Sequence, residues 1–232
     1  MPRFTDSFDA MLHALEALGP PFPPASTNEP GITFAVITAS LLSRMFAPRQ
    51  ARTTWEAFHA AGFNSPEIVA NAKLSELVEK TKNLPAPLKP LSEKTLTPLY
   101  LLSKCIVDFG GLNALDEVPT EELRDELLMM PGISPAMADA VLLYGLKRPT
   151  YPADGPTYRI LARHGWIEPT TDYEEVRATI EQPAYGDVVI LSALAAWLNR
   201  AGELYCKAKV SMCEGCPLAP FLPDGGPCET TE

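Results

Sequence analysis

The sequence contains no long apolar run. Its most apolar stretch, VVILSALAAWL from Val188 to Leu198, has 11 residues, whereas a helix that crosses a bilayer needs about 20. We therefore expect this stretch to form a buried helix. The first residues, MPRFTDSFDAM, contain no apolar segment of the kind that signal peptides carry, so we expect an intracellular protein.

Positive charge is also scarce. Lysine and arginine number 19 against 29 aspartates and glutamates, so the net charge is −10 at pH 7. A chain with this balance repels polyanions at long range, which argues against nucleic acid as a partner unless local features override it. The chain has 232 residues, of which 46% are hydrophobic and 21% are charged. These values are ordinary for a globular protein with one large domain or two small lobes.

No segment shows sustained alternation of apolar and polar residues, and no internal repeat stands out. Apolar residues such as Phe8, Met11 and Leu15 recur instead at helical spacing. The sequence therefore predicts an all-α protein. Later helices are expected at about 120–130, about 135–144, about 155–164 and about 186–200. Two proline-rich segments, 19–31 and 84–98, are expected to be irregular connectors.

Cysteine is rare outside one short segment. Four of the five cysteines lie between Cys206 and Cys228 with the spacing C-x6-C-x2-C-x11-C, while Cys105 is expected in the core. In a reducing compartment, clustered cysteines bind metal more often than they form disulfides. Four thiolates suit either a zinc ion or a 4Fe-4S cluster; because zinc sites usually have two close pairs and this loop has one, the cluster is favoured. Its ligands would be Cys206, Cys213, Cys216 and Cys228.

The segment ELLMMPGISPAMADAVLLYGL joins two expected helices by a tight turn, PGIS. Gly132 permits a backbone conformation that other residues resist, and Ser134 followed by Pro135 is a good helix start. The free N–H groups at such a start could bind a phosphate. An ordinary hairpin within a helical bundle explains the same residues.

The segment YPADGPTYRILARHGW contains a second candidate, Asp154. Because Asp154 precedes Gly-Pro, it could simply cap the next helix. A carboxylate facing a cleft at that place could also stabilise a developing cation or orient a water molecule. Arg159 and Arg163 lie four residues apart on the same helix, where they could contact phosphates or merely face solvent.

In this order and spacing, the MPGI hairpin, the aspartate in ADGPTYRILARHGW and the terminal cysteine loop resemble the endonuclease III family of helix-hairpin-helix DNA glycosylases. The resemblance covers most of the chain. It implies two helical lobes with a DNA-binding cleft between them. One lobe would be a six-helix barrel at 31–149 with its hairpin at about 120–145, and the other would be an iron-sulfur cluster domain combining 1–30 with 150–232, with the cluster loop at 206–228.

The resemblance also implies an activity. Such enzymes flip a damaged or mismatched base out of double-stranded DNA and cut its N-glycosidic bond. The catalytic aspartate of the family falls on Asp154, its phosphate-binding hairpin on Gly132, Ile133 and Ser134, and its cluster ligands on the four terminal cysteines. A monomer of the cytoplasm, associated with the nucleoid if the source is bacterial, is expected.

Three positions depart from the family pattern. Ser134 replaces a second glycine of the hairpin, Met45 stands where the gap left by the flipped base is filled, and Ala136 stands where strand-nicking members carry a lysine. A methyl group cannot form a Schiff base, and no other lysine lies between Lys104 and Lys147. The sequence therefore predicts a monofunctional glycosylase.

Two lysines of the cysteine loop, Lys207 and Lys209, could form a phosphate-binding strip on the acidic protein, or they could simply be solvated.

Two other functions stay open. A catalytically weak or inactive DNA-binding protein on the same fold would suit the negative charge. A small electron-transfer protein would suit the cluster loop, but a helical body of this size makes that hypothesis the weaker one.

Overall fold

The computed structural model describes residues 3–21, 33–86 and 88–228. Within these ranges the chain is helical and forms no β-strand, apart from an isolated bridge between Cys206 and Ser211. The all-α prediction is confirmed. No helix in this part of the chain is long and apolar enough to cross a membrane. The connector predicted at 19–31 lies largely outside the described residues.

Contacts within the chain divide it into two compact units. The continuous unit is the segment Pro24–Arg148, and the split unit combines Met1–Pro23 with Pro149–Glu232. Each unit has its own buried apolar residues. The chain therefore leaves the split unit after its first helix, α1 (Phe4–Leu15), and returns to it later.

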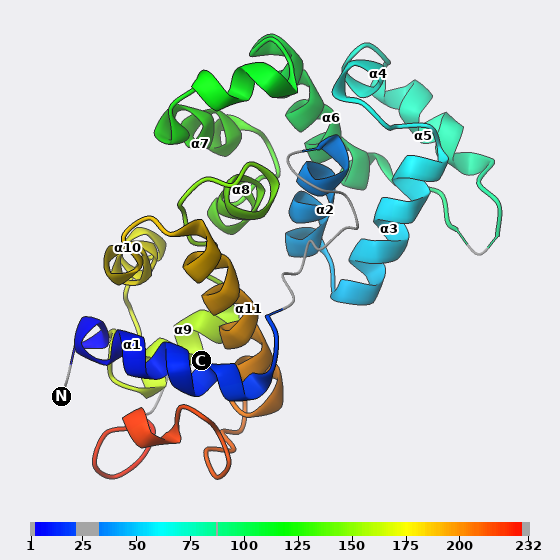
Figure 1. Ribbon diagram of the computed structural model, residues 1–232. Helices are drawn as coiled ribbons and strands as arrows, with labels where there is room; N and C mark the ends of the chain where they lie inside the picture. Colours follow the sequence, from blue (N-terminus) through cyan, green and yellow to red (C-terminus); the bar gives the residue numbers. More distant parts are fainter. Residues whose placement is uncertain (1–2, 22–32, 87, 229–232) are drawn as a thin grey trace. The chain divides into compact units, whose positions relative to one another are not determined.

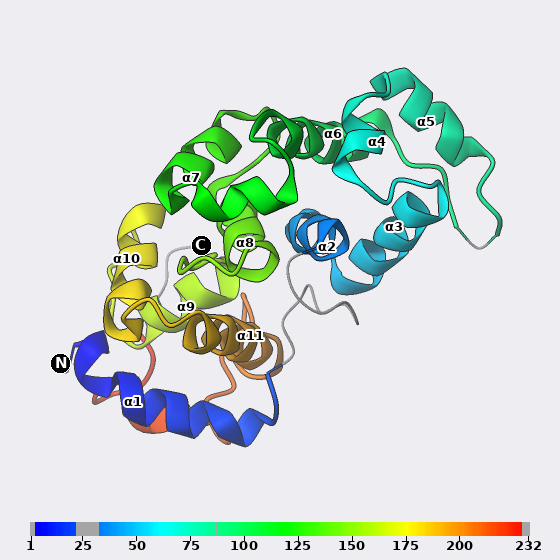
Figure 2. The same cartoon turned by 45° about the horizontal axis from the view of Figure 1, so that its top comes forward.

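The continuous unit consists of helices joined by turns and short loops (Figure 1). In chain order they are α2 (Phe34–Met45), α3 (Pro48–Ala60), α4 (Pro66–Ala70), α5 (Leu74–Lys82), α6 (Glu93–Asp108), α7 (Thr120–Met129) and α8 (Pro135–Ala140). A 3-10 helical turn at Leu112–Glu117 and a π-helical turn at Val141–Gly145 complete the unit. Helix α2 lies between α3 on one side and α8 with the π-helical turn on the other (Figures 1 and 2).

Helix α2 is central to this unit because most of its residues are buried. Thr33 caps the helix by accepting a hydrogen bond from the N–H of Val36 at 3.2 Å. Ile37 and Leu41, one turn apart, are both fully buried. Gly145 of the π-helical turn comes so close that a Cβ on it would lie 3.1 Å from the Cα of Ile37. A side chain at position 145 would push the two elements apart.

Helix α6 begins earlier than the sequence predicts. Ser92 caps it by accepting a hydrogen bond from the N–H of Thr95 at 3.2 Å, so 93–98 is helical and the expectation of irregular backbone there is wrong. Pro98 lies inside the helix and is buried. Burial of apolar side chains such as Leu99 outweighs the single backbone hydrogen bond that the proline removes.

The split unit contains α1, α9 (Gly155–Arg163), α10 (Tyr173–Ala184) and α11 (Val188–Leu204). A loop follows that carries the four terminal cysteines. Helix α1 packs against α10 and α11, although these are far away in the sequence (Figure 1). Its buried apolar residues recur at helical spacing: Phe4, Phe8, Met11 and Leu15. The apolar face of α1 is therefore buried against α10 and α11 and forms part of the core of the split unit.

Helices α9 and α11 pack at close range. A Cβ on Gly202 would lie 2.6 Å from the Cβ of Pro156, so glycine is needed for this approach. The predicted buried helix at Val188–Leu198 is part of α11. Leu194 in this stretch is fully buried, whereas Val189 is 77% exposed. The prediction is therefore correct for the inner face of the helix.

Candidate functional site

The predicted hairpin is formed by α7 and α8. Gly132 has a φ of 87°, in the left-handed region that glycine adopts without strain. Ser134 caps α8 by accepting a hydrogen bond from the N–H of Met137 at 3.4 Å, while Ile133 turns inward and is 8% exposed. The predicted turn and helix start are both present. Because Gly132 and Ser134 are exposed, the backbone of the turn is accessible.

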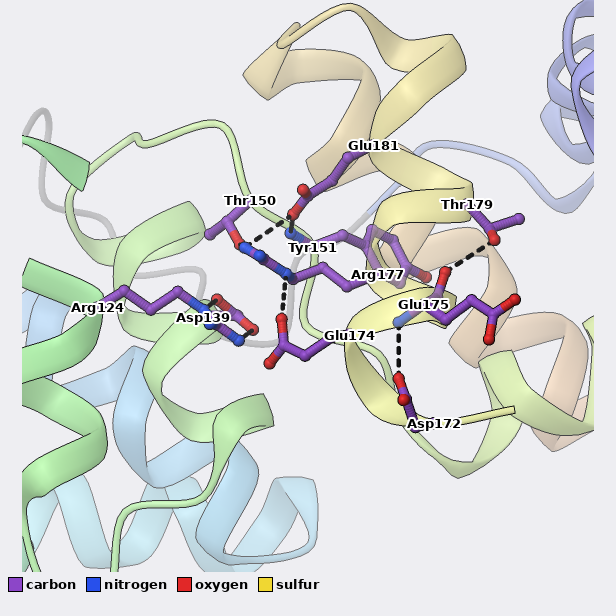
Figure 3. A network of polar contacts seen from close by, with 10 residues as sticks. All are labelled: Arg124, Asp139, Thr150, Tyr151, Asp172, Glu174, Glu175, Arg177, Thr179 and Glu181. Carbon is purple, nitrogen blue, oxygen red and sulfur yellow. Dashed lines mark hydrogen bonds and ion pairs between the residues drawn. The ribbon is translucent and has the colours of Figure 1, made fainter. Parts of the chain in front are cut away.

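A buried ion pair joins the two helices of this hairpin. The guanidinium of Arg124 on α7 donates to the two carboxylate oxygens of Asp139 on α8 at 2.8 Å and 3.2 Å. The side chains are 6% and 0% exposed, and Figure 3 shows them drawn against each other. A bidentate pair fixes the relative orientation of the helices that carry it. Sequence reasoning missed the pair, because its members lie 15 residues apart on different helices.

Ala136 and Met45 also belong to the continuous unit. Ala136 is the second residue of α8 and is half-buried. Met45 ends α2, where its half-buried side chain packs against the core of the unit. The methyl group of Ala136 offers neither a nucleophile nor a charge at its position in the hairpin.

Asp154 is the N-cap of α9, as one of the two sequence hypotheses predicts. Its Oδ1 accepts hydrogen bonds from the N–H of Thr157 at 3.0 Å and from the Thr157 hydroxyl at 2.9 Å. Its Oδ2 accepts another from the side-chain amide of Asn199 on α11 at 2.8 Å. These donors hold the half-buried carboxylate at both oxygens.

The loop before α9 is anchored by α10 (Figure 3). Glu181 accepts a hydrogen bond from the N–H of Tyr151 at 2.7 Å, and Arg177 donates to the hydroxyl of Thr150 at 3.4 Å. The hydroxyl of the buried Tyr151 is 3.0 Å from that of Thr157. The backbone that leads into the aspartate is therefore fixed by contacts to α10 before it and to α9 after it.

The four terminal cysteines lie in the loop after α11. Cys206 is buried and the other three are half-buried. None of the cysteines in the described residues forms a disulfide. Cys206, Cys213 and Cys216 line one small apolar cavity, which Ile160 and Leu218 also border.

The remaining cysteine of the loop, Cys228, is hydrogen-bonded through its backbone to the end of α9. Its N–H donates to the carbonyl of Arg163 at 2.8 Å. Burial raises the pKa of the Cys216 thiol, and the nearby Cys213 and Cys206 raise that pKa further. Cys206, Cys213 and Cys216 therefore lie near one another, as ligands of one metal group must.

The residue types of the loop suit a thiolate-bound metal group. Four free thiols, three of them around one apolar cavity, provide the donors that structural zinc sites and iron-sulfur clusters use. Within the described residues, however, no group of three or more His, Cys, Asp and Glu side chains is arranged to hold a metal ion. The donor set therefore fits, while the geometry of a formed site is not present.

Arg159 and Arg163 have a role that neither sequence hypothesis describes. The buried guanidinium of Arg163 donates to the Sγ of Cys206 at 3.2 Å and to the carbonyls of Lys207 and Ala208 at 2.8 Å and 2.9 Å. Arg159 donates to the carbonyl of Cys206 at 3.2 Å. Arg163 is therefore not on a solvated face. Both arginines hold the start of the cysteine loop on α9.

Lys207 and Lys209 are exposed, so their ammonium groups are accessible, which suits both hypotheses made for them. Cys105 lies on α6, where it is half-buried in the continuous unit. Burial, with the added charges of Glu126 and Asp108, raises the pKa of the Cys105 thiol to about 11. The thiol of Cys105 is therefore protonated and poorly suited to metal binding.

Sequence relatives of the chain exist, although no protein-family model matches it. A Methanocaldococcus jannaschii protein assigned to the DNA repair glycosylases is 28% identical over 174 residues, which cover 68% of this chain and 77% of the relative. A chloroplastic endonuclease III homologue of Arabidopsis thaliana is 26% identical over 204 residues, which cover 82% of this chain but 48% of the relative. Endonuclease III of Thermotoga maritima is 26% identical over 157 residues, which cover 67% of each chain.

Solved structures share the fold at lower sequence identity. A non-covalent endonuclease III–DNA complex matches with a TM-score of 0.68 and 18% identity, covering 95% of this chain and 96% of that one. A thermostable thymine-DNA glycosylase matches with a TM-score of 0.66 and 17% identity, covering 94% of both chains. The fold and the hairpin thus define the class: the chain has the helical fold of the helix-hairpin-helix glycosylases. In sequence the chain is similar to endonuclease III of Thermotoga maritima and to the other relatives named above.

Proposed function

We propose that the protein is a DNA-repair glycosylase that removes a damaged or mismatched base from double-stranded DNA and acts as a monomer. The observation that carries the proposal is the carboxylate of Asp154, held at the start of α9 by donors on both oxygens. A fixed carboxylate can stabilise the cationic sugar that develops as an N-glycosidic bond breaks. Relatives named as a DNA repair glycosylase and as endonuclease III support the same reaction class.

The proposed reaction is hydrolysis of a base that has been flipped out of the duplex. When the bond from C1′ to the base nitrogen breaks, its electron pair leaves with the base and the sugar becomes positively charged. The carboxylate of Asp154 would stabilise that charge and orient the attacking water. The water oxygen bonds to C1′, and the proton that the water loses balances the one that the departing base takes up.

A finer proposal is that the product is an intact abasic site. Cutting of the strand by this family requires an amine that attacks the sugar and forms a Schiff base. Ala136 provides no amine at the position that the family resemblance indicates, and Lys147, the next lysine in the sequence, follows the π-helical turn rather than α8. With the carboxylate retained and the amine missing, water is the nucleophile.

DNA would be held through its phosphates at the hairpin and at the cysteine loop. The exposed turn at Gly132 and Ser134 offers backbone N–H groups to a phosphate. Exposed Lys207 and Lys209 add positive charge to a protein whose net charge is −10. Met45 would fill the space left by the flipped base. Binding of this kind weakens steeply with salt, and replacing both lysines with alanine should lower the affinity and the salt dependence.

The cysteine loop would hold a 4Fe-4S cluster through Cys206, Cys213, Cys216 and Cys228. When bound, the cluster supplies iron–thiolate bonds that cross-link the loop. The guanidinium of Arg163, which donates to the Sγ of Cys206, is suited to a thiolate there. Purified protein is expected to be brown with about four irons per chain. Colourless protein with one zinc ion would overturn the cluster and leave the glycosylase proposal standing.

The experiment that tests the activity is a single-turnover excision assay on duplexes that carry different damaged or mismatched bases. Wild-type protein is expected to release at least one of these bases, with strand breaks only after alkali or an added abasic-site nuclease. Asp154→Asn is expected to slow release by about 100-fold to 10,000-fold, the usual size of acid–base and charge effects. Treatment with borohydride should trap no covalent protein–DNA adduct.

The outcomes separate the alternatives. Absence of release from every duplex would favour the DNA-binding protein without catalytic activity. Efficient trapping would overturn the monofunctional mechanism alone. Because asparagine caps helices as well as aspartate does, full activity of Asp154→Asn would mean that the residue is a helix cap and nothing more.

A further inference from the structure

The least expected partner of Asp154 is Asn199. It lies 45 residues away in the sequence, on α11, and its Nδ2 donates to Oδ2 of the carboxylate at 2.8 Å. The donors to Oδ1 both come from Thr157, within the helix that Asp154 caps. We propose that Asn199 is a positioning residue that orients the Asp154 carboxylate for base excision, an inference that rests on the proposed function.

The helix cap by itself does not set the plane of the carboxylate. Rotation about the bond from Cβ to the carboxylate carbon has broad energy wells, so donors to Oδ1 do not by themselves fix the direction of Oδ2. The amide of Asn199 donates to Oδ2 from a second helix and restricts that rotation. The direction in which the lone pairs of Asp154 point therefore depends on α11 as well as on α9.

The packing of α11 on α9 brings the amide within reach. Gly202 follows Asn199 by three residues, so both lie on the same face of α11. The missing side chain of Gly202 lets α11 approach Pro156 in the first turn of α9, where a Cβ would come to 2.6 Å from the proline Cβ. Asn199 and Gly202 thus face the start of α9 together. A wider spacing of the two helices would break the 2.8 Å hydrogen bond.

An amide has the right chemistry for this position. Its NH2 group donates to a carboxylate without adding a positive charge of its own, so the hydrogen bond from Asn199 does not itself neutralise Asp154. A basic residue at position 199 would compensate that charge before the reaction begins. A leucine of similar size would remove the donor and leave the packing of α11 nearly unchanged.

The test compares Asn199→Leu with wild-type protein on a duplex that the wild type cleaves. Single-turnover excision at saturating protein is expected to slow by about 10-fold to 100-fold, as for other residues that orient a functional group. The affinity for a duplex with an uncleavable abasic analogue and the melting temperature are expected to stay unchanged. Asn199→Gln, which restores a donor, should recover part of the rate. Ser192→Ala, at another half-buried polar position of α11, is the matched control and should keep the wild-type rate.

A double-mutant cycle separates an indirect role from an independent one. Asp154→Asn combined with Asn199→Leu is expected to be no slower than Asp154→Asn alone, because Asn199 acts through Asp154. If the rate losses of the two single variants multiplied in the double variant, the inference would be wrong. It would also be wrong if Asn199→Leu excised the base at the wild-type rate, or if it bound DNA more weakly than the wild type. A wild-type protein that releases no base overturns the proposed function together with this inference, whereas an active wild type and an equally active Asn199→Leu overturn the role of Asn199 alone.

Discussion

Each unit contains a buried arginine next to its candidate functional residues, and the two arginines are compensated differently. In the continuous unit, Arg124 pairs with the carboxylate of Asp139. In the split unit, Arg163 contacts two carbonyls and the Sγ of Cys206, and no carboxylate in the described residues pairs with it. A buried charge without a counter-charge is costly. The continuous unit therefore supplies its own counter-charge, whereas in the split unit a metal-bound thiolate at Cys206 would supply one.

The difference predicts which part of the protein would depend on a bound metal. A thiol bound to a metal is deprotonated, so iron or zinc would keep Cys206 in the form that Arg163 requires. The hairpin, held by an ion pair between two ordinary side chains, has no such requirement. We therefore expect removal of the metal to weaken the cysteine loop and to leave the hairpin intact.

The largest effect is expected from breaking the ion pair of the continuous unit. Asp139→Leu leaves the Arg124 charge buried without the carboxylate that pairs with it, and should lower the free energy of unfolding by about 3–5 kcal/mol. Arg124→Met combined with Asp139→Leu should recover most of that loss, because the charge leaves with its partner. Urea denaturation measures both. A double variant as unstable as the single one would mean that packing, rather than charge, makes Asp139 necessary.

A smaller loss is expected from Arg163→Met. The substitution leaves the carbonyls of Lys207 and Ala208 without their charged donor, and should lower the free energy of unfolding by about 1.5–3 kcal/mol. The iron content of the purified protein should fall as well. Arg200→Met, at an exposed position of α11, is the matched control and should change neither quantity. Normal iron content in Arg163→Met would contradict the link between this arginine and the cysteine loop.

The cysteines of the two units should also differ in reactivity. The pKa of Cys105 is raised from 9.0 to about 11, so at pH 8 its thiolate is about 100-fold less abundant than that of an ordinary cysteine. In metal-free protein, iodoacetamide is therefore expected to modify Cys213 long before Cys105. Mass spectrometry of timed samples gives the order. Modification of Cys105 first would show that its surroundings open on the time scale of the reaction.

The smallest effect is expected from His164, which follows Arg163 at the end of α9. Burial lowers the pKa of His164 from 6.5, although hydrogen bonds to the carbonyls of Ile160 and Leu218 oppose the shift. Below about pH 6.5 the unfolded chain binds a proton that the folded protein resists, so the free energy of unfolding should fall as the pH decreases further. His164→Gln should reduce this slope. Equal slopes in denaturation series from pH 8 to pH 5 would assign the pH dependence to other groups.

Local chemistry was enough to predict several helix starts. Ser134 before Pro135 and Asp154 before Gly-Pro were both expected to cap helices, and both do. The prediction of irregular backbone up to Pro98 is wrong, because the penalty for a proline inside a helix is local, while the burial that offsets it depends on tertiary packing. The existence of α6 was predictable, but the residue at which it begins was not.

The partners of the candidate site were the least predictable part. Asn199 reaches Asp154 only because Gly202 lets two distant helices approach. From helical spacing alone, the side chain of Arg163 is expected to contact phosphate or solvent, because the spacing does not show which neighbouring segment covers a residue. The DNA-contact roles of Gly132 and Ala136 stay predictions, since they depend on a partner that the sequence describes only through its resemblance to a family.

The split unit has a consequence for the order of events on the ribosome. Helix α1 is synthesised before the whole of Pro24–Arg148, yet the helices that cover its apolar face, α10 and α11, come after that segment. The continuous unit can fold as soon as it leaves the ribosome, whereas the rings of Phe4 and Phe8 stay exposed to solvent until α10 and α11 have been synthesised. In the nascent chain, α1 is made before the continuous unit but can pack only after α10 and α11 have been made, and a chaperone that covers apolar helices would protect it until then.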